Sequence, residues 1–229
     1  MGAHLMLKQL SAFLLAAVLA VGCFKSSPKV KPVDPYLAIL SSIAPIEMQT
    51  EDGSYSPICT SASINSSRNY WLTAAHCVPE PNPETGYAPH IQILGEVANP
   101  VHLDRAKDLA ILQTASVHLP IRNIAFYPPK LGDQLILAGH TSPIGMAGPI
   151  LTFGWVAHPS LIPNLPPPYD RPQMVIQIPG APGHSGSPIL NKHGDVVSVL
   201  QTGWGSSWGP VVMGAPFSDI RELLKFWIE

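Results

Sequence analysis

Short apolar or alternating runs recur along the chain, separated by glycine, proline and asparagine. Runs of about four to eight residues with this alternation are typical of β-strands, and the residues between them are typical of turns. The pattern predicts strands at residues 70–73, 91–94, 109–112, 134–138, 150–156, 174–178, 188–190 and 196–200. So many short strands joined by turns favour an all-β sandwich or barrel.

Only the end of the chain predicts a helix. Ser218 or Asp219 can serve as its N-cap, and the apolar residues that follow share one helical face: Ile220, Leu223, Leu224 and Trp227. We expect this face to pack on the predicted strands.

The composition supports a β-rich fold with a sizeable core. Proline makes up 26 of 229 residues, which excludes a helical bundle, since proline breaks helices and suits loops and sheet edges. One proline-rich stretch, 159–172, predicts a long surface loop. Hydrophobic residues are 46% and charged residues 12% of the chain, which argues against disorder. The formal net charge of −2 excludes the basic surface expected of a nucleic-acid-binding protein.

The N-terminal segment predicts export. An uncharged run at 10–22 follows Lys8; it has the length of a signal-peptide hydrophobic region and is too short to span a membrane comfortably. Its end, Leu19-Ala20-Val21-Gly22-Cys23, resembles the bacterial lipoprotein signal, in which the cysteine is lipidated and becomes the new N-terminus. The resemblance implies a membrane-anchored protein of the bacterial cell envelope. The alternative is a secreted protein with a plain signal cut nearby, in which Cys23 is incidental.

The domain boundaries follow from the uncharged run at 10–22 and from the composition of the residues after it. We assign residues 1–22 to the signal peptide, 23–35 to a tether rich in proline and lysine, and 36–229 to the folded domain.

Three short motifs carry the candidate chemistry. Leu72-Thr73-Ala74-Ala75-His76-Cys77 has a histidine at a strand end, Asp108 precedes the apolar run 109–112, and Gly183-His184-Ser185-Gly186-Ser187-Pro188 has a serine in a glycine-rich turn. Each is weak alone. In the order His, Asp, Ser, they resemble the trypsin-like serine peptidases of the chymotrypsin fold, bacterial type, from about residue 58 to 227.

The resemblance implies a fold and a reaction. The fold is all-β, with two antiparallel six-stranded β-barrels, a boundary near 120–132 and a C-terminal helix. The reaction is endopeptidase cleavage through an acyl-enzyme, with Ser185 as nucleophile, His76 as general acid and base, and Asp108 orienting the imidazole. Asp104 is a competing carboxylate; Asp108 is preferred because the run 109–112 follows it directly. We expect a monomer acting on a protein or peptide substrate, with no cofactor and no metal ion.

The same resemblance implies an oxyanion hole and a substrate pocket. The oxyanion donors are the backbone N–H groups of Gly183 and Ser185. His184 stands where many animal enzymes carry an aspartate that pairs with a newly cut N-terminus, so we expect no such activation. The pocket is expected from Pro179, Gly180, Ala181 and Pro182 and from Gln201, Thr202 and Gly203. The absence of an acidic residue there favours a small or apolar substrate side chain over a basic one.

The cysteines and the remaining motifs narrow the choice of family. Cys59 and Cys77 resemble the disulfide that joins the strand before the catalytic histidine to the histidine turn; two unpaired buried cysteines are the alternative. An α/β-hydrolase is excluded because Ser187 stands at the last glycine of GxSxG. The chain has no CxxC or HExxH motif.

Two other functions remain open. The first is a catalytically silent or latent protease-like lipoprotein that only binds. The second is an enzyme that cleaves only its own tether or a single partner.

Overall fold

The computed structural model describes residues 34–65, 67–117, 119–141, 148–206 and 209–227. The predicted signal peptide, Cys23 and nearly all of the predicted tether lie outside the described residues. Asp34–Glu229 form one unit, which begins with helix α2 (Pro35–Leu40), where the Asp34 carboxylate accepts the Tyr36 N–H at 2.9 Å. Among the helices of the described residues, none has the length and apolar character needed to cross a membrane.

The first half of the domain is a seven-stranded antiparallel sheet. Its order is β5-β4-β1-β2-β3-β7-β6, and a 3₁₀ turn, η1 (Ala75–Cys77), follows β3. The strands are β1 (Ile43–Gln49), β2 (Tyr55–Asn65), β3 (Tyr70–Thr73), β4 (Ile91–Ile93), β5 (Glu96–Val97), β6 (Asn99–Asp104) and β7 (Leu109–Gln113).

This sheet differs in detail from the six-stranded barrel that we expected. Strands β5 and β6 are separated only by Ala98, whose N–H donates to the Ile91 carbonyl at 2.9 Å. One run of chain, 96–104, therefore pairs with β4 at one edge of the sheet and with β7 at the other. The seventh strand arises because this run is interrupted at Ala98. The two edges of the sheet are connected by the continuous chain 96–104, and not by hydrogen bonds between two edge strands.

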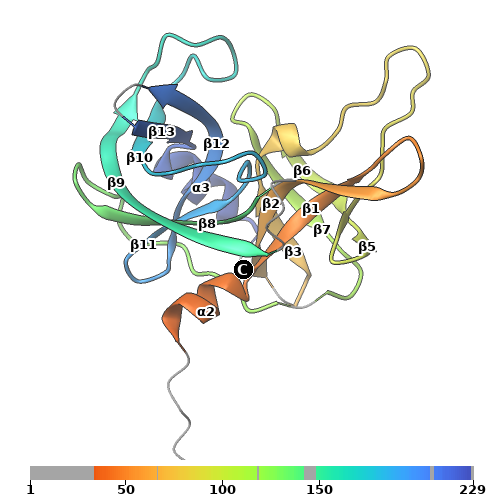
Figure 1. Ribbon diagram of the computed structural model, residues 1–229, viewed down its shortest axis with the longest axis horizontal. Coiled ribbons are helices and arrows are strands. Elements are labelled where there is room, and N and C mark those ends of the chain that lie inside the picture. The colour runs from red at the N-terminus through yellow and green to blue at the C-terminus, as the bar shows by residue number, and fades with distance from the viewer. Residues whose placement is uncertain (1–33, 66, 118, 142–147, 207–208, 228–229) are drawn as a thin grey trace, which may run out of the picture. The chain divides into compact units, whose positions relative to one another are not determined.

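The second half is a closed six-stranded barrel, as expected, with the order β10-β13-β12-β11-β8-β9. Figure 1 shows this barrel beside the first sheet, with α3 (Phe217–Leu224) next to it. The strands are β8 (Gln134–His140), β9 (Pro149–Leu161), β10 (Gln173–Gln177), β11 (Pro188–Asn191), β12 (Val196–Ser206) and β13 (Gly209–Gly214). The all-β fold class with a C-terminal helix is thus confirmed.

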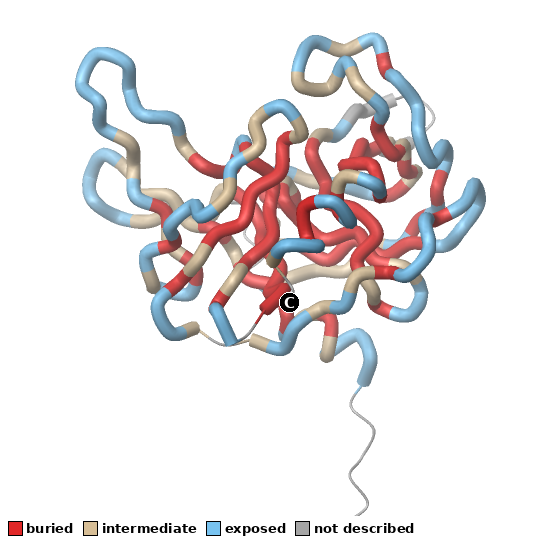
Figure 2. Tube along the Cα trace, turned by 180° about the vertical axis from the view of Figure 1, so that it is seen from behind, coloured by how far each residue is buried: buried red, intermediate tan, exposed pale blue. Residues whose placement is uncertain are grey.

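The core consists of two apolar clusters. One joins the first sheet to the second barrel and α3, and the other lies inside the second barrel. Figure 2 shows the buried residues following the strands while the loops are exposed. The fully buried Trp71 still places its indole N–H on Thr114 Oγ1 at 3.0 Å, as a buried polar group must.

The C-terminal helix packs as predicted, but its ends differ. Ile220, Leu223 and Leu224 are buried. The N-cap is Pro216, so the helix begins earlier than predicted, and Ser218 and Asp219 lie inside its first turn. The Asp219 carboxylate pairs there with Arg171. Trp227 lies beyond the helix, edge-on against Tyr70 with ring centroids 5.2 Å apart.

Candidate active site

His76 lies on a turn that is held by a disulfide and by an arginine. Its neighbours in η1, Ala75 and Cys77, are fully buried, whereas the His76 side chain is 37% exposed. The disulfide Cys59–Cys77 ties the turn to β2, with the two Cα atoms 5.9 Å apart. The Arg105 guanidinium donates to the carbonyls of Ala75, the first residue of the turn, and Val78, the residue that follows it. The backbone under His76 is therefore fixed while its ring faces outward.

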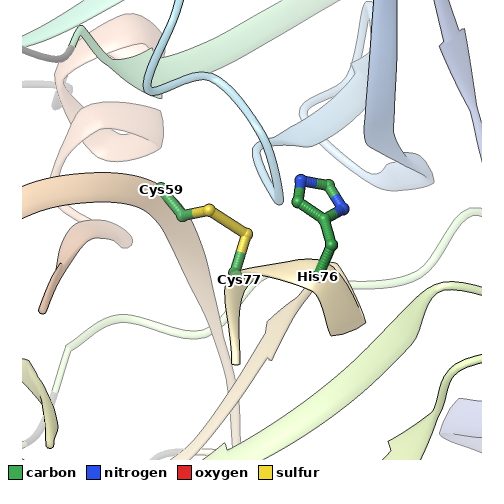
Figure 3. A group of neighbouring side chains, drawn as sticks. All are labelled: Cys59, His76 and Cys77. Atoms are coloured by element: carbon green, nitrogen blue, oxygen red, sulfur yellow. A yellow bond between two sulfur atoms is a disulfide. The ribbon is translucent and has the colours of Figure 1, made fainter. Parts of the chain in front are cut away.

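Figure 3 shows the His76 ring beside this disulfide. One potential ligand atom from each of Cys59, His76 and Cys77 lies within 4.8 Å of the others. Metal binding by cysteine requires a thiolate, and the disulfide leaves neither sulfur in that form. This cluster is therefore a structural brace for the His76 turn.

Asp108 is buried against His76 immediately before β7. Its side chain is 4% exposed, and its backbone has φ of 49°, in the left-handed region that few residues other than glycine adopt. Oδ1 accepts the His76 backbone N–H at 2.8 Å, and Oδ2 lies 2.9 Å from His76 Nδ1. The Gln201 side-chain amide, from β12, donates to the Asp108 carbonyl at 3.0 Å. Asp108 is therefore placed by contacts from both halves of the domain.

The competing carboxylate, Asp104, has another role. Its Oδ1 accepts the Lys107 N–H at 2.8 Å, which closes the turn between β6 and β7. Of the two aspartates that we considered, the structure brings Asp108 to His76.

Ser185 lies on a turn of the second barrel that docks against β2. The Ser185 carbonyl accepts the Thr60 N–H at 2.8 Å, and Thr60 Oγ1 donates to the Gly183 carbonyl at 2.9 Å. Gly186 has φ of 78°, and a Cβ there would lie 2.1 Å from Thr73 Oγ1 and 2.4 Å from the Thr60 carbonyl oxygen. The turn therefore requires glycine at 186 both for its conformation and for its close approach to the first sheet.

His184 shapes the same turn from inside. It is 1% exposed, and its Nδ1 accepts the Ala181 N–H at 3.1 Å, so the ring proton is on Nε2. His140 lies near it, and the His140 backbone N–H donates to Thr60 Oγ1 at 2.8 Å. Burial lowers the pKa of His184, and burial together with His184 lowers the pKa of His140 to about 4. Both imidazoles are therefore neutral near pH 7.

The backbone donors expected at the oxyanion position are unpaired. Within the part of the chain that the structure describes, neither the Gly183 N–H nor the Ser185 N–H has a hydrogen-bond acceptor. Two free N–H groups on one glycine-containing turn are the arrangement that can bind a developing negative charge.

A cavity of about 500 Å³ connects these groups. It contains six of the seven predicted pocket residues; Pro179 is not among its described lining residues, and the Pro179 carbonyl accepts the Thr152 hydroxyl at 2.8 Å. None of the described lining residues is Asp, Glu, Lys or Arg. Its residues are His76, Tyr169, Gly180, Ala181, Pro182, Ser185, Leu200, Gln201, Thr202, Gly203, Val211 and Val212.

One expected contact is not made in this state. His76 and Ser185 line the same cavity, but among the described residues no hydrogen bond joins the His76 ring to the Ser185 hydroxyl. In enzymes without substrate such a bond is often long, and it tightens when substrate binds.

Sequence reasoning missed four residues that hold this site: Thr60, Arg105, Tyr169 and, as a backbone support for Asp108, Gln201. Each acts through a contact far away in the sequence, such as the 123 residues between Thr60 and Gly183. None lies in a motif, so no local signal identifies them.

Comparisons with known proteins bear on the family and the fold. The protein-family model for the trypsin-like peptidase domain matches residues 59–199. The Rv3671c protease from M. tuberculosis, in its active form, superposes with a TM-score of 0.66 at 18% identity, covering 87% of this chain and 86% of that chain. The HtrA-type protease AlgW, with a tripeptide, gives a TM-score of 0.65 at 19% identity, covering 86% of this chain. The matched part is 64% of the AlgW chain, less than two thirds of its length. At these identities the likeness shows a common fold. No curated protein sequence matches the chain.

Proposed function

Because the trypsin-like peptidase model matches most of the folded domain, the chain belongs to that family, and we propose that it is a serine endopeptidase. The reaction proposed is peptide hydrolysis through an acyl-enzyme. The observation that carries the proposal is the 2.9 Å contact between His76 Nδ1 and Asp108 Oδ2, at a cavity that Ser185 also lines.

The proposed roles follow from proton positions. A carboxylate only accepts hydrogen bonds, so the Nδ1 proton of His76 points at Asp108, and Nε2 keeps the lone pair that a general base needs. His76 would take the proton of Ser185 as the hydroxyl attacks the carbonyl carbon, and would then give it to the leaving amine. Asp108 would stabilise the imidazolium between these two steps.

The oxyanion would be bound by the N–H groups of Gly183 and Ser185. Among the described residues, neither N–H group has a hydrogen-bond acceptor, which supports this role. Each such donor contributes about 2.7–4 kcal/mol to lowering the barrier in enzymes where one has been removed. The docking of this turn on Thr60 would keep the two donors in place before substrate arrives.

The substrate is proposed to carry a small or apolar side chain before the cleaved bond. Besides the polar residues of the site, the described cavity wall consists of glycine, alanine, proline, leucine and valine, and none of its described residues is an aspartate or glutamate that would select lysine or arginine. Val212 narrows this cavity, since a Cβ on Gly180 would lie 2.8 Å from Val212 Cγ1. A large aromatic side chain would meet this constriction.

The site of action is proposed to be the bacterial cell envelope, with the protein exported and held on the membrane by a lipidated Cys23. The support is the sequence ending in Cys23 and the Cys59–Cys77 disulfide, since disulfides persist in oxidising compartments outside the cytosol. Mass spectrometry of the protein from membranes tests the lipidation. Acyl chains on an N-terminal Cys23 support it, and an unmodified N-terminus elsewhere contradicts it.

The activity is tested with a peptide library and an unfolded protein as substrates. We expect cleavage by the wild-type protein and a loss of about 10³-fold or more in both Ser185→Ala and His76→Ala. Mapping of the cleavage sites gives the side-chain preference at the same time. Equal cleavage by wild type and Ser185→Ala would show that the activity does not depend on Ser185.

A latent form is the second candidate, because of the missing hydrogen bond between His76 and Ser185. A latent or silent binding protein would neither cleave the library nor react with a serine-directed probe. An enzyme restricted to its own tether or one partner would react with the probe without cleaving the library.

A further inference from the structure

Tyr169 contacts the buried Asp108 from the opposite half of the domain. Its hydroxyl donates to Asp108 Oδ2 at 3.2 Å, and the same oxygen lies 2.9 Å from His76 Nδ1. The other oxygen, Oδ1, accepts the His76 backbone N–H at 2.8 Å. Among the described residues, Tyr169 is therefore the only side chain besides His76 that donates a hydrogen bond to this carboxylate.

The hydroxyl stays a donor over the whole range of neutral pH. Burial raises the pKa of Tyr169, and the adjacent negative charge of Asp108 raises it further. A hydrogen bond to an ionised group is stronger than one between neutral groups. Since the Asp108 side chain is only 4% exposed, water has little access to replace a lost donor there.

The loop that carries Tyr169 is fastened on both sides of it. The Tyr169 N–H donates to the Pro166 carbonyl at 3.0 Å. Two residues later, Arg171 binds the Asp219 carboxylate of α3, with Nη1 at 2.7 Å from Oδ2. These two side chains are 20% and 16% exposed, so the ion pair is shielded from solvent. The loop therefore presents the hydroxyl in a fixed position.

The Tyr169 ring also lines the cavity that contains His76 and Ser185. A substrate side chain in this cavity can contact the ring whose hydroxyl holds Asp108. One residue thus touches both the place for the substrate and the carboxylate that orients the imidazole.

We propose that Tyr169 is a positioning residue, which orients the Asp108 carboxylate towards His76 from the second barrel and couples filling of the cavity to that orientation. The proposal rests on the proposed peptidase function. Tyr169 acts through Asp108 and takes part in no bond making or breaking. If Tyr169 only formed part of the cavity wall, its ring would be required and its hydroxyl would not.

The test is Tyr169→Phe, which keeps the ring and removes the hydroxyl. We expect kcat on a peptide substrate to fall about tenfold, equivalent to about 1.4 kcal/mol in the barrier, with KM changed by less than about twofold. Tyr127→Phe is the matched control, since Tyr127 is 77% exposed and does not line this cavity. It should match the wild type in both parameters. An unchanged kcat in Tyr169→Phe, or a rise in KM alone, would overturn the proposal.

A spectroscopic measurement separates this proposal from the peptidase function itself. The proton between His76 Nδ1 and Asp108 gives a low-field NMR resonance in the resting protein, which needs no substrate. We expect this resonance to shift in Tyr169→Phe and to stay in place in Tyr127→Phe. If the wild type cleaves nothing, the peptidase proposal fails, and the resonance still decides the role of Tyr169. An unmoved resonance in a folded Tyr169→Phe protein would overturn it.

Discussion

Thr60 Oγ1 donates a hydrogen bond of 2.9 Å to the carbonyl oxygen of Gly183. The donor belongs to β2 of the first sheet and the acceptor to the turn of the second barrel that carries Ser185. The same hydroxyl accepts the His140 N–H at 2.8 Å, so one buried side chain satisfies two backbone groups of the second barrel. The relative placement of His76 and Ser185 depends on this junction, since Cys59, next to Thr60, is bonded to Cys77, next to His76.

Replacing the hydroxyl tests the junction. Thr60→Val keeps the shape of the side chain but leaves the Gly183 carbonyl and the His140 N–H without their partner. We expect the free energy of unfolding to fall by about 1–3 kcal/mol, the cost of buried unpaired polar groups. Peptidase activity should fall about tenfold, because the Ser185 turn loses a fixed point. Thr85→Val, in an exposed loop, is the control and should change stability by less than about 0.5 kcal/mol. Equal effects from both variants, in urea denaturation, would contradict this role.

Gly186→Ala tests the close approach of the turn to the first sheet. The new Cβ would lie 2.1 Å from Thr73 Oγ1 and 2.4 Å from the Thr60 carbonyl, so the turn must move. Gly53→Ala is the control, because Gly53 also has a positive φ, 84°, but no atom lies within 4 Å of an added Cβ. It therefore measures the backbone strain without the clash. We expect Gly53→Ala to cost about 1–2 kcal/mol and to keep activity. Gly186→Ala should cost more and should abolish cleavage; retained activity there would show that the turn can shift freely.

His140 and His184 make the free energy of unfolding dependent on pH. The pKa of His140 is about 4 in the folded protein, against 6.5 for a free side chain. As the pH falls from 6.5 to 4, the unfolded chain takes up a proton that folded His140 does not, so the free energy of unfolding decreases. His184 acts in the same direction, because burial lowers its pKa too. Stability from these groups is therefore fully present above pH 6.5 and is lost towards pH 4.

Chemical denaturation of wild type and His140→Gln at several pH values isolates this contribution. One pKa unit corresponds to ~1.4 kcal/mol, and because His140 is only partly buried we expect about 1–2 kcal/mol over this range. Carboxylates contribute equally to both proteins, so the difference between the two curves reports His140. Parallel curves would contradict the lowered pKa.

The Cys59–Cys77 disulfide closes a loop of 18 residues. In the chain-entropy account, a loop of this length stabilises the fold by ~3 kcal/mol. The double variant Cys59→Ser, Cys77→Ser should lose about this amount in thermal or urea unfolding. Adding a reductant should lower the stability of the wild type to that of the variant and leave the variant unchanged. A wild type insensitive to a reductant that demonstrably breaks the bond would contradict a stabilising role.

The residues of this site that the sequence predicts are those that lie in short local motifs. His76, Asp108 and Ser185 each lie in a short stretch whose residue types serve that place: buried alanines around His76, an apolar run after Asp108, glycines around Ser185. The strand periodicity is local too, so all eight predicted strands correspond to strands of the structure. The β2 strand was missed because its residues are mostly small and buried on both faces, which removes the alternation.

The remaining features depend on contacts between distant segments. Tyr169 and Asp108 are 61 residues apart, and Tyr169 lies in a proline-rich loop without periodicity. The pairing of Arg171 with Asp219, which lie 48 residues apart, could not be predicted for the same reason. The interruption at Ala98, which gives the first sheet its seventh strand, follows from how the chain closes that sheet and not from the residue itself.

The proposed reaction requires that His76 and Asp108 activate the hydroxyl of Ser185. Labelling of the purified protein with a fluorophosphonate probe tests this most directly, because the probe bonds only to an activated serine. We expect one phosphonyl group on the wild type, located on Ser185 by peptide mass spectrometry, and no label on Ser185→Ala or on folded His76→Ala. A folded wild-type protein that does not react, or a label on any other serine, would contradict it.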